Sequence, residues 1–453
     1  MKILLCFLKF RESLNFRGLC EFAAFKGQLE TLKWLRNKNV DWDEMTCADA
    51  AKSGHFEILK WALANDCPWN KKTCEYAAKG GHFEILKWAI ANGCPIGKKT
   101  VTAAAKGGTV EMFKWLQKNW PKPDFPLESE AFGAALERGD LDIIKWLYNE
   151  KCTRENCMWY AAQGGHLEVL KWLVEHGYKL KDIVFSEAAK RGDLKTIEWA
   201  RSRGCNWNSD TCSGAAAGGH LKLLKWLRDN DCPWNANTCE KAAENGHFEI
   251  VKWARENGCE WDEQTFQKAT RKFSVEQLQW LKDNGCPFDK YAYRYPAMRG
   301  RLDVLQWLFD NKVPLDKNVC THAAGGGDIK VVKWLRDHKC PWNYETANAA
   351  ASNNHLRLLK WLVKNKCPID YYDVIEEASG HGSLEVMKWL WEINEHECHY
   401  LATTNAASGY LDVLKWLVSV GCKWDSDATE LARENGYKYI YEWALENGCP
   451  DCK

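Results

Sequence analysis

Residues 73–99 read TCEYAAKGGHFEILKWAIANGCPIGKK, and variants of this string follow one another along almost the whole chain of 453 residues. Each copy carries a tryptophan at the position of Trp88, and twelve of the fifteen intervals between these marker tryptophans are 27 residues. The marker tryptophans are Trp34, Trp61, Trp88, Trp115, Trp146, Trp172, Trp199, Trp226, Trp253, Trp280, Trp307, Trp334, Trp361, Trp389, Trp416 and Trp443. A fixed period of this length predicts a solenoid, in which each repeat buries its apolar surface against its neighbours.

Each copy is predicted to form two helices, which we call the first helix and the second helix, and the second contains the marker tryptophan. A glycine stands seven residues before this tryptophan in fourteen of the sixteen copies, as expected for the left-handed residue that ends a helix. The residues expected to cap the second helix are Thr109, Asp140, Asp193, Ser274 and Asp328. No segment alternates polar and apolar residues, so no strand is predicted. The predicted fold is an all-α solenoid of about sixteen stacked helix-turn-helix repeats.

Lysine directly precedes the marker tryptophan in twelve copies, which raises the alternative of a basic stripe that binds nucleic acid. Eleven copies also carry Asp or Glu three residues before that position, so pairs such as Glu57 with Lys60, or Glu168 with Lys171, neutralise the stripe. We interpret it as a solvated helix face, and a nucleic-acid-binding array is the least favoured hypothesis.

The first helix has one constant side and one variable side. The positions of Cys74, Ala77 and Ala78 fall together, and alanine occupies the Ala77 position in fourteen copies, so neighbouring helices must approach closely there. The remaining positions change from copy to copy, which is typical of repeat proteins that bind partners through one face; neutral drift on an exposed face is the alternative. The residues predicted to bind a protein partner are Tyr76, Lys79, Trp159, Tyr160, Gln163, Arg294 and Tyr295.

Composition limits the possible partners and compartments. Lys plus Arg is 62 and Asp plus Glu is 61, so no net charge attracts the chain to nucleic acid or to a membrane. No run reaches the roughly eighteen apolar residues of a membrane span, and MKILLCFLKF at the start lacks the apolar core and cleavage site of a signal peptide. Residues 1–18 are predicted to be a degenerate half-repeat that caps the array, with Phe7 in the tryptophan position, and residues 19–453 to be the array. We expect a monomer in the cytoplasm.

Cysteine and histidine are frequent but are interpreted as structural. Eleven of the 21 cysteines stand six residues after a marker tryptophan, and six stand fourteen residues before one. Equivalent cysteines of stacked repeats would lie about 8–10 Å apart, too far for a disulfide, so we predict reduced, buried thiols. Histidine precedes the second helix in six copies, where it is expected to cap or to pack. The cluster His396, Cys398 and His399 lacks the second half of a zinc site, and no nucleophile or phosphate-binding motif occurs. No metal, cofactor or catalytic residue is predicted.

The repeated pattern AAxxGHxEIxKWxxxNG resembles the ankyrin repeat over residues 19–450. The Ala-Ala and Gly-His elements match, whereas the period is 27 instead of about 33 residues and the T-P-L-H element is missing. The resemblance implies stacked helix pairs without the usual β-hairpin finger, so the first helices must carry more of the partner contact. The tetratricopeptide repeat, with its unit of about 34 residues, is a weaker match.

The resemblance implies a non-catalytic scaffold that presents the variable side of its first helices to protein partners. This tryptophan- and cysteine-rich variant is similar to arrays of large DNA viruses of amoebae and of some protists, which would place it in the host cytoplasm. Several such arrays carry an F-box, and none is visible here. A substrate adaptor in ubiquitin-dependent degradation is therefore kept as an alternative.

Overall fold

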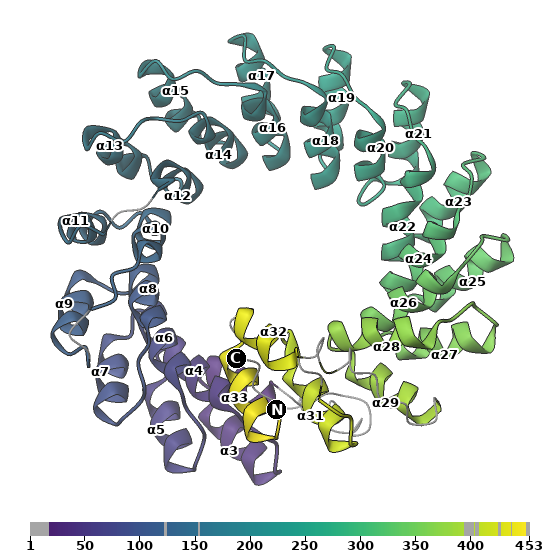
Figure 1. Ribbon diagram of the computed structural model, residues 1–453. Helices are drawn as coiled ribbons and strands as arrows, with labels where there is room; N and C mark the ends of the chain where they lie inside the picture. Colours follow the sequence, from purple (N-terminus) through teal and green to yellow (C-terminus); the bar gives the residue numbers. More distant parts are fainter. Residues whose placement is uncertain are drawn as a thin grey trace. The chain divides into compact units, whose positions relative to one another are not determined.

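The computed structural model describes residues 18–121, 125–152, 155–393, 403, 407–424, 427–435 and 437–449. Over these residues it contains 31 α-helices, one 3-10 helix and no strand. The chain divides into two compact units, residues 1–211 and 212–453. Each unit is a stack of helix pairs, so the predicted all-α solenoid is confirmed, and each of the sixteen marker tryptophans lies in a second helix (Figure 1).

The first helices are short, and fifteen of them lie within the described residues. They are α2 (Leu19–Phe25), α4 (Glu44–Lys52), α6 (Lys71–Lys79), α8 (Lys98–Gly107), α10 (Ser129–Arg138), α12 (Cys157–Gly164), α14 (Ile183–Arg191), α16 (Ser209–Gly218), α18 (Ala236–Asn245), α20 (Glu263–Ala269), η1 (Lys290–Tyr293) with α22 (Arg294–Arg299), α24 (Lys317–Gly326), α26 (Tyr344–Ser352), α28 (Tyr371–Gly380) and α32 (Ala428–Glu434).

The second helices alternate with them along the chain. They are α3 (Leu29–Asn37), α5 (Phe56–Ala64), α7 (Phe83–Ala91), α9 (Val110–Lys118), α11 (Leu141–Asn149), α13 (Leu167–Glu175), α15 (Leu194–Ser202), α17 (Leu221–Asp229), α19 (Phe248–Glu256), α21 (Val275–Asp283), α23 (Leu302–Asp310), α25 (Ile329–Asp337), α27 (Leu356–Lys364), α29 (Leu384–Ile393), α31 (Leu411–Ser419) and α33 (Lys438–Glu446).

Polar caps fix where these helices begin and end. The Asn70 side chain accepts a hydrogen bond from the Lys72 backbone N–H at 2.8 Å, which starts α6. Gly81, with φ of +76°, then turns the chain toward α7. All five residues predicted to cap second helices accept a hydrogen bond from a backbone N–H. The repeat boundaries read from the sequence are thus confirmed.

Histidine at the start of a second helix packs instead of capping. His55 forms no cap hydrogen bond within α5, and its Nε2 lies 3.2 Å from the backbone carbonyl oxygen of Phe25 in the preceding repeat. His247 and His355 make the same contact, with Ala217 and Gly325. Of the two predicted roles, packing is the one that is observed, and it joins successive repeats.

The core of each unit lies between the two rows of helices. Cys74, Ala77 and Ala78 of α6 and Leu86 of α7 are fully buried. Because alanine occupies the contact, first helices of successive repeats pack closely, as α6 does on α4 and on α8. Second helices are held further apart by aromatic side chains, such as Phe56 and Trp88, whose ring centroids are 5.3 Å apart. Each unit therefore curves with its first helices on the inner side (Figure 1).

The connection between repeats is a short loop in place of a hairpin finger, as the missing sequence element predicted. Trp69 in the loop before α6 packs edge-on against Trp88, with ring centroids 6.1 Å apart. In the preceding repeat Arg36 lies over the Trp42 ring at 4.2 Å. These contacts bury the loop against the second helix, so the loop gives each repeat part of its packing surface.

The cysteines are arranged differently from the sequence-based expectation. From the sequence, pairing was considered only between cysteines at equivalent positions of different repeats. The structure instead brings the two cysteine positions of one repeat together, and Cys74 in α6 is hydrogen-bonded to Cys94 in the loop after α7. This contact and burial raise the pKa of Cys74, so the thiol stays protonated. Of the cysteines in the described ranges, seventeen are free, as predicted, whereas Cys422 is disulfide-bonded, which corrects the prediction for that position.

Two predictions fall wholly or largely outside the described residues: the half-repeat cap at 1–18 and the cluster of His396, Cys398 and His399. No helix in the described ranges is long and apolar enough to cross a membrane.

Candidate partner-binding face

The side of the first helices that points away from the core is the surface on which the predicted partner-binding residues lie. We call it the first-helix face. Four of the seven predicted residues are exposed there, namely Lys79, Trp159, Gln163 and Arg294. The other three are half-buried, namely Tyr76, Tyr160 and Tyr295. All seven lie on first helices of their respective units, and none of them is fully buried.

Trp159 and Tyr160 of α12 form a concave part of this face. Their rings meet edge to face with centroids 4.8 Å apart, and 38% of Trp159 is exposed. Together with Asn156, Lys181 and Ile183 they line an open pocket of about 390 Å³. An aromatic wall beside a lysine ammonium can hold an apolar side chain next to an acidic group.

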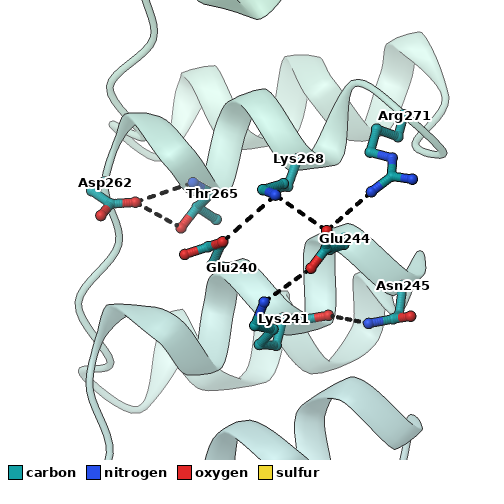
Figure 2. A network of polar contacts seen from close by, with 8 residues as sticks. All are labelled: Glu240, Lys241, Glu244, Asn245, Asp262, Thr265, Lys268 and Arg271. Atoms are coloured by element: carbon teal, nitrogen blue, oxygen red, sulfur yellow. Dashed lines mark hydrogen bonds and ion pairs between the residues drawn. The ribbon is translucent and has the colours of Figure 1, made fainter. Parts of the chain in front are cut away.

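The sequence-based prediction did not foresee the polar network beside Tyr295. Glu244 of α18 forms ion pairs with Lys241 at 3.1 Å, with Lys268 of α20 at 3.1 Å and with Arg271 at 3.0 Å (Figure 2). Burial raises the pKa of the Glu244 carboxyl, but hydrogen bonds from Lys241 and Lys268 outweigh it, so the net pKa lies below the ordinary value. The network links α18 to α20.

Tyr295 of α22 belongs to this network as much as to the exposed face. The Arg271 guanidinium lies 4.9 Å from its ring centroid, and the Lys268 ammonium hydrogen-bonds with it and lies 5.8 Å from the centroid. Burial lowers the pKa of His322, and the positive charge of Arg294, next to Tyr295 in the sequence, lowers it further. Tyr295 therefore has a packing role, whereas Trp159 is held by fewer contacts.

Lys79 proves to be one member of a larger basic group that the sequence-based prediction left out. Lysines also begin α6 and α8, in the pairs Lys71-Lys72 and Lys98-Lys99, and all of these but the half-buried Lys72 are exposed. Lys106 occupies in α8 the position that Lys79 has in α6. Tyr76 lies between Lys79 and Lys52, whose ammonium is 5.5 Å from the Tyr76 ring centroid. The Lys-Lys dipeptides were visible in the sequence, but their alignment on neighbouring helices required the packing of the repeats.

Comparison with known families now assigns the repeat. A model described as ankyrin repeats (3 copies) matches residues 100–183, and one described as ankyrin repeats (many copies) matches residues 47–90 and 294–336. This chain is an ankyrin-repeat protein. The short period and the missing finger element set its ankyrin repeats apart without changing the helix pair.

Solved structures resemble the ankyrin array only weakly. The pentatricopeptide repeat protein PPR10 from maize is 11% identical, with 96% of this chain and 85% of that chain covered and a TM-score of 0.30. The same protein in complex with an 18-nt psaJ RNA element is 12% identical, with 96% of this chain and 84% of that chain covered and a TM-score of 0.27. The human ASB11 ankyrin repeat domain is 16% identical, with 53% of this chain and 99% of that chain covered and a TM-score of 0.25. A comparison with curated protein sequences gave no significant match.

The opposite face of the ankyrin array, formed by the second helices, carries the lysine stripe. Lys60 pairs with Glu57 at 3.0 Å, and Lys171 pairs with Glu168 at 2.7 Å. Lys33, Lys87 and Lys388 are paired in the same way. Five of the twelve stripe lysines are thus ion-paired among the described residues, whereas Lys225, Lys333 and Lys360 have a basic residue at the position expected for the acid. The prediction that acids neutralise the stripe holds for part of it.

Groups of three or more metal-ligating side chains do not occur among the described residues of the ankyrin array. Its cysteines that come together in pairs are buried, with Cys74 and Cys239 fully enclosed. The face with the most exposed and variable chemistry is therefore the first-helix face.

Proposed function

We propose that this ankyrin-repeat protein is a non-catalytic scaffold that binds protein partners through the first-helix face. One observation carries the proposal: along the first helices, the positions that stay constant in the sequence are buried and the positions that change are exposed. In α12, for example, Ala161 and Ala162 are fully buried, whereas Trp159 is 38% exposed. A constant core supports the array, so the changing residues are free to select a partner.

The chemistry of the exposed residues supports a protein partner. Large aromatic side chains with part of their surface in solvent are the residues that most often dominate protein interfaces. On first helices these include Phe22, Phe25 and Tyr344 besides Trp159. We propose that the array acts as a monomer in the cytoplasm, where reduction would keep the free thiols unpaired. A substrate adaptor in protein degradation would be one use of such a scaffold.

The test compares two sets of substitutions in affinity capture from cell extracts, with quantitative mass spectrometry. The face variant carries Trp159→Ala, Tyr160→Ala and Arg294→Ala; the control variant carries Lys60→Ala, Lys87→Ala and Lys171→Ala on second helices. We expect specific partners of the wild type to be depleted at least tenfold with the face variant and to persist with the control. Circular dichroism checks that both variants fold. Loss with the control variant alone would show that the second-helix face is the binding surface.

A further inference from the structure

Six lysines on two adjacent first helices form one basic area. We call it the lysine surface: Lys71, Lys72 and Lys79 on α6, and Lys98, Lys99 and Lys106 on α8. At about 100° per residue, the three lysines of each helix fall within one arc of about 100°, on the side opposite the buried Thr73 and Ala77 of α6 and Thr100 and Ala104 of α8. Since α6 packs directly on α8, the two arcs continue into each other.

In the part of the chain that the structure describes, only two of the six lysines form an ion pair, and Glu75 of α6 lies in the field of three of them without pairing with any. Lys72 reaches Glu44 at 3.6 Å and Lys98 reaches Glu128 at 3.1 Å, although 72% of the Lys98 side chain stays exposed. Among the described residues, no carboxylate lies within 4.0 Å of the other four ammonium groups. By contrast, Lys268 of α20 and Arg271, which follows this helix, are held by Glu244 (Figure 2). The lysine surface therefore keeps a net positive charge that the network of α18 and α20 does not have.

Stability of the helices does not explain these lysines. The first turn of a helix favours acidic residues, because its backbone N–H groups carry a partial positive charge. Both α6 and α8 have no acidic residue in the first turn and begin with two lysines instead. Four ammonium groups at two adjacent helix starts raise the energy of the free array, and an anionic ligand would lower it.

We propose that the lysine surface binds an acidic peptide segment of a protein partner. This deepens the proposed function and rests on it, because the lysine surface is part of the first-helix face. The carboxylates of the segment would pair with Lys71, Lys79, Lys99 and Lys106, and Tyr76 beside them offers an aromatic surface to the chain between the carboxylates.

The borders of the lysine surface favour a short peptide over nucleic acid. On one side α4 carries Glu44 and Asp49 together with Lys52, and on the other α10 carries Glu130 and Glu137. First helices of successive repeats are about 10 Å apart, so the basic area extends over only two repeats before acidic side chains follow. The phosphates of a nucleic acid continue at regular intervals and would meet these carboxylates, whereas an acidic segment can end or change its composition there.

Glu75 of α6 points to the same class of ligand. Its Oε1 atom is buried and has no hydrogen-bond partner, and it lies within the field of Lys99, Lys71 and Lys72. A peptide backbone has N–H groups that can donate to this oxygen, and a DNA phosphodiester backbone has none. Glu75 therefore suits a ligand that brings donors as well as carboxylates.

The experiment measures binding of a fluorescent peptide of alternating glutamate and serine by anisotropy, using the full chain. The test variant changes Lys71, Lys79, Lys99 and Lys106 to Gln. The matched control changes Lys33, Lys60, Lys87 and Lys171 to Gln; it removes the same charge from second helices, and melting curves check that both fold. We expect the test variant to bind at least tenfold more weakly and the control less than twofold. Binding should also weaken severalfold between about 50 mM and about 200 mM NaCl.

Equal weakening in both variants would overturn the proposal, since only net charge would then matter. A single-stranded oligonucleotide that binds more tightly than the peptide, and loses binding in the test variant alone, would also overturn it in favour of a nucleic-acid interface. The capture experiment separates this proposal from the general one. If the lysine test variant captures the same partners as the wild type while the aromatic face variant does not, the scaffold function stands and the acidic-segment proposal fails.

Discussion

The thiol of Cys94 donates a hydrogen bond to the backbone carbonyl oxygen of Asn70, 3.3 Å away. Asn70 starts the first helix of the repeat and Cys94 follows its second helix, so this bond joins the two ends of one repeat. The equivalent bonds are Cys67 to Asp43, Cys152 to Glu128, Cys259 to Asn235, Cys286 to Asp262, Cys340 to Asp316 and Cys367 to Asn343. The cysteine column thus has a bonding role besides its packing.

Substituting Cys94→Ala should lower the free energy of unfolding of its repeat by about 1–2 kcal/mol, because a buried donor and part of a buried side chain are lost. Hydrogen exchange of the α6 and α7 amides measures the local effect. Cys205→Ala is the matched control, because Cys205 occupies the same column but is only half-buried. If Cys205→Ala reduced the amide protection around position 205 by as much, the thiol-to-carbonyl hydrogen bond would add no stability beyond that of side-chain burial.

Gly327 stands where the first helix of one repeat approaches the histidine of the next. Its φ is +78°, and a Cβ atom built on it would lie 2.5 Å from the His355 ring, whose Nε2 donates to the Gly325 carbonyl oxygen at 3.1 Å. We expect Gly327→Ala to cost about 2–4 kcal/mol, of which about 1 kcal/mol comes from the left-handed backbone and the rest from displacing the histidine.

The control for this substitution is Gly285→Ala. Gly285 has φ of +80°, but nothing lies within 4 Å of its Cβ position, so only the backbone cost of about 1 kcal/mol is expected. Chemical denaturation of the two variants compares them directly. If both lose the same stability, the contact with His355 is not what requires glycine at position 327.

Much of the fold could be predicted because the repeat makes every position visible sixteen times. The turn at Gly81, the caps such as Asp140 and the absence of strands from the described residues all follow from local chemistry that a pattern exposes. The ion pairs of the second helices were equally predictable, since Glu57 and Lys60 are three residues apart on one helix.

Contacts between positions far apart in the sequence could not be predicted. Cys74 and Cys94 belong to different columns, and only the angle between the two helices brings them together. Likewise, Glu244 and Arg271 are equivalent positions of successive repeats, so their ion pair depends on the spacing of the stack. The same limit applies to the candidate site: the sequence shows which side of the first helices varies, but which of its residues are held by neighbours required the structure.

The network in Figure 2 should contribute measurably to the stability of residues 212–453. Glu244→Gln removes the charge that holds Lys268 and Arg271, whose side chains are mostly buried, so we expect a loss of about 1–2 kcal/mol. Hydrogen exchange of the α18 and α20 amides gives the readout. Glu84→Gln on a second helix is the control: its pair with Lys87 is largely exposed and should contribute less than about 0.5 kcal/mol.

The contribution of Glu244 should depend on pH in a defined direction. Its folded-state pKa is lower than the ordinary glutamate value of 4.5, so the stabilisation is complete above that value and is lost as the pH falls through the folded-state pKa. The stability difference between wild type and Glu244→Gln should therefore shrink from pH 7 toward pH 3. Burial raises the pKa of Glu75, so Glu75→Gln should instead stabilise the protein near pH 7, with the gain fading in acid.

Trp159 and Tyr295 should respond differently to truncation, although both were predicted as partner-binding residues. Trp159 is partly exposed and rests mainly on Tyr160, so Trp159→Ala should change the free energy of unfolding by less than about 1 kcal/mol while it removes much of a binding anchor. Tyr295 lies beside Arg271, Lys268 and Arg294, so Tyr295→Ala should cost about 1–2 kcal/mol. Two measurements on each single variant, chemical denaturation for stability and partner capture for binding, separate these roles. A larger stability loss for Trp159→Ala than for Tyr295→Ala would show that Trp159 is a packing residue, and the pocket beside it would then lose its main support as a binding site.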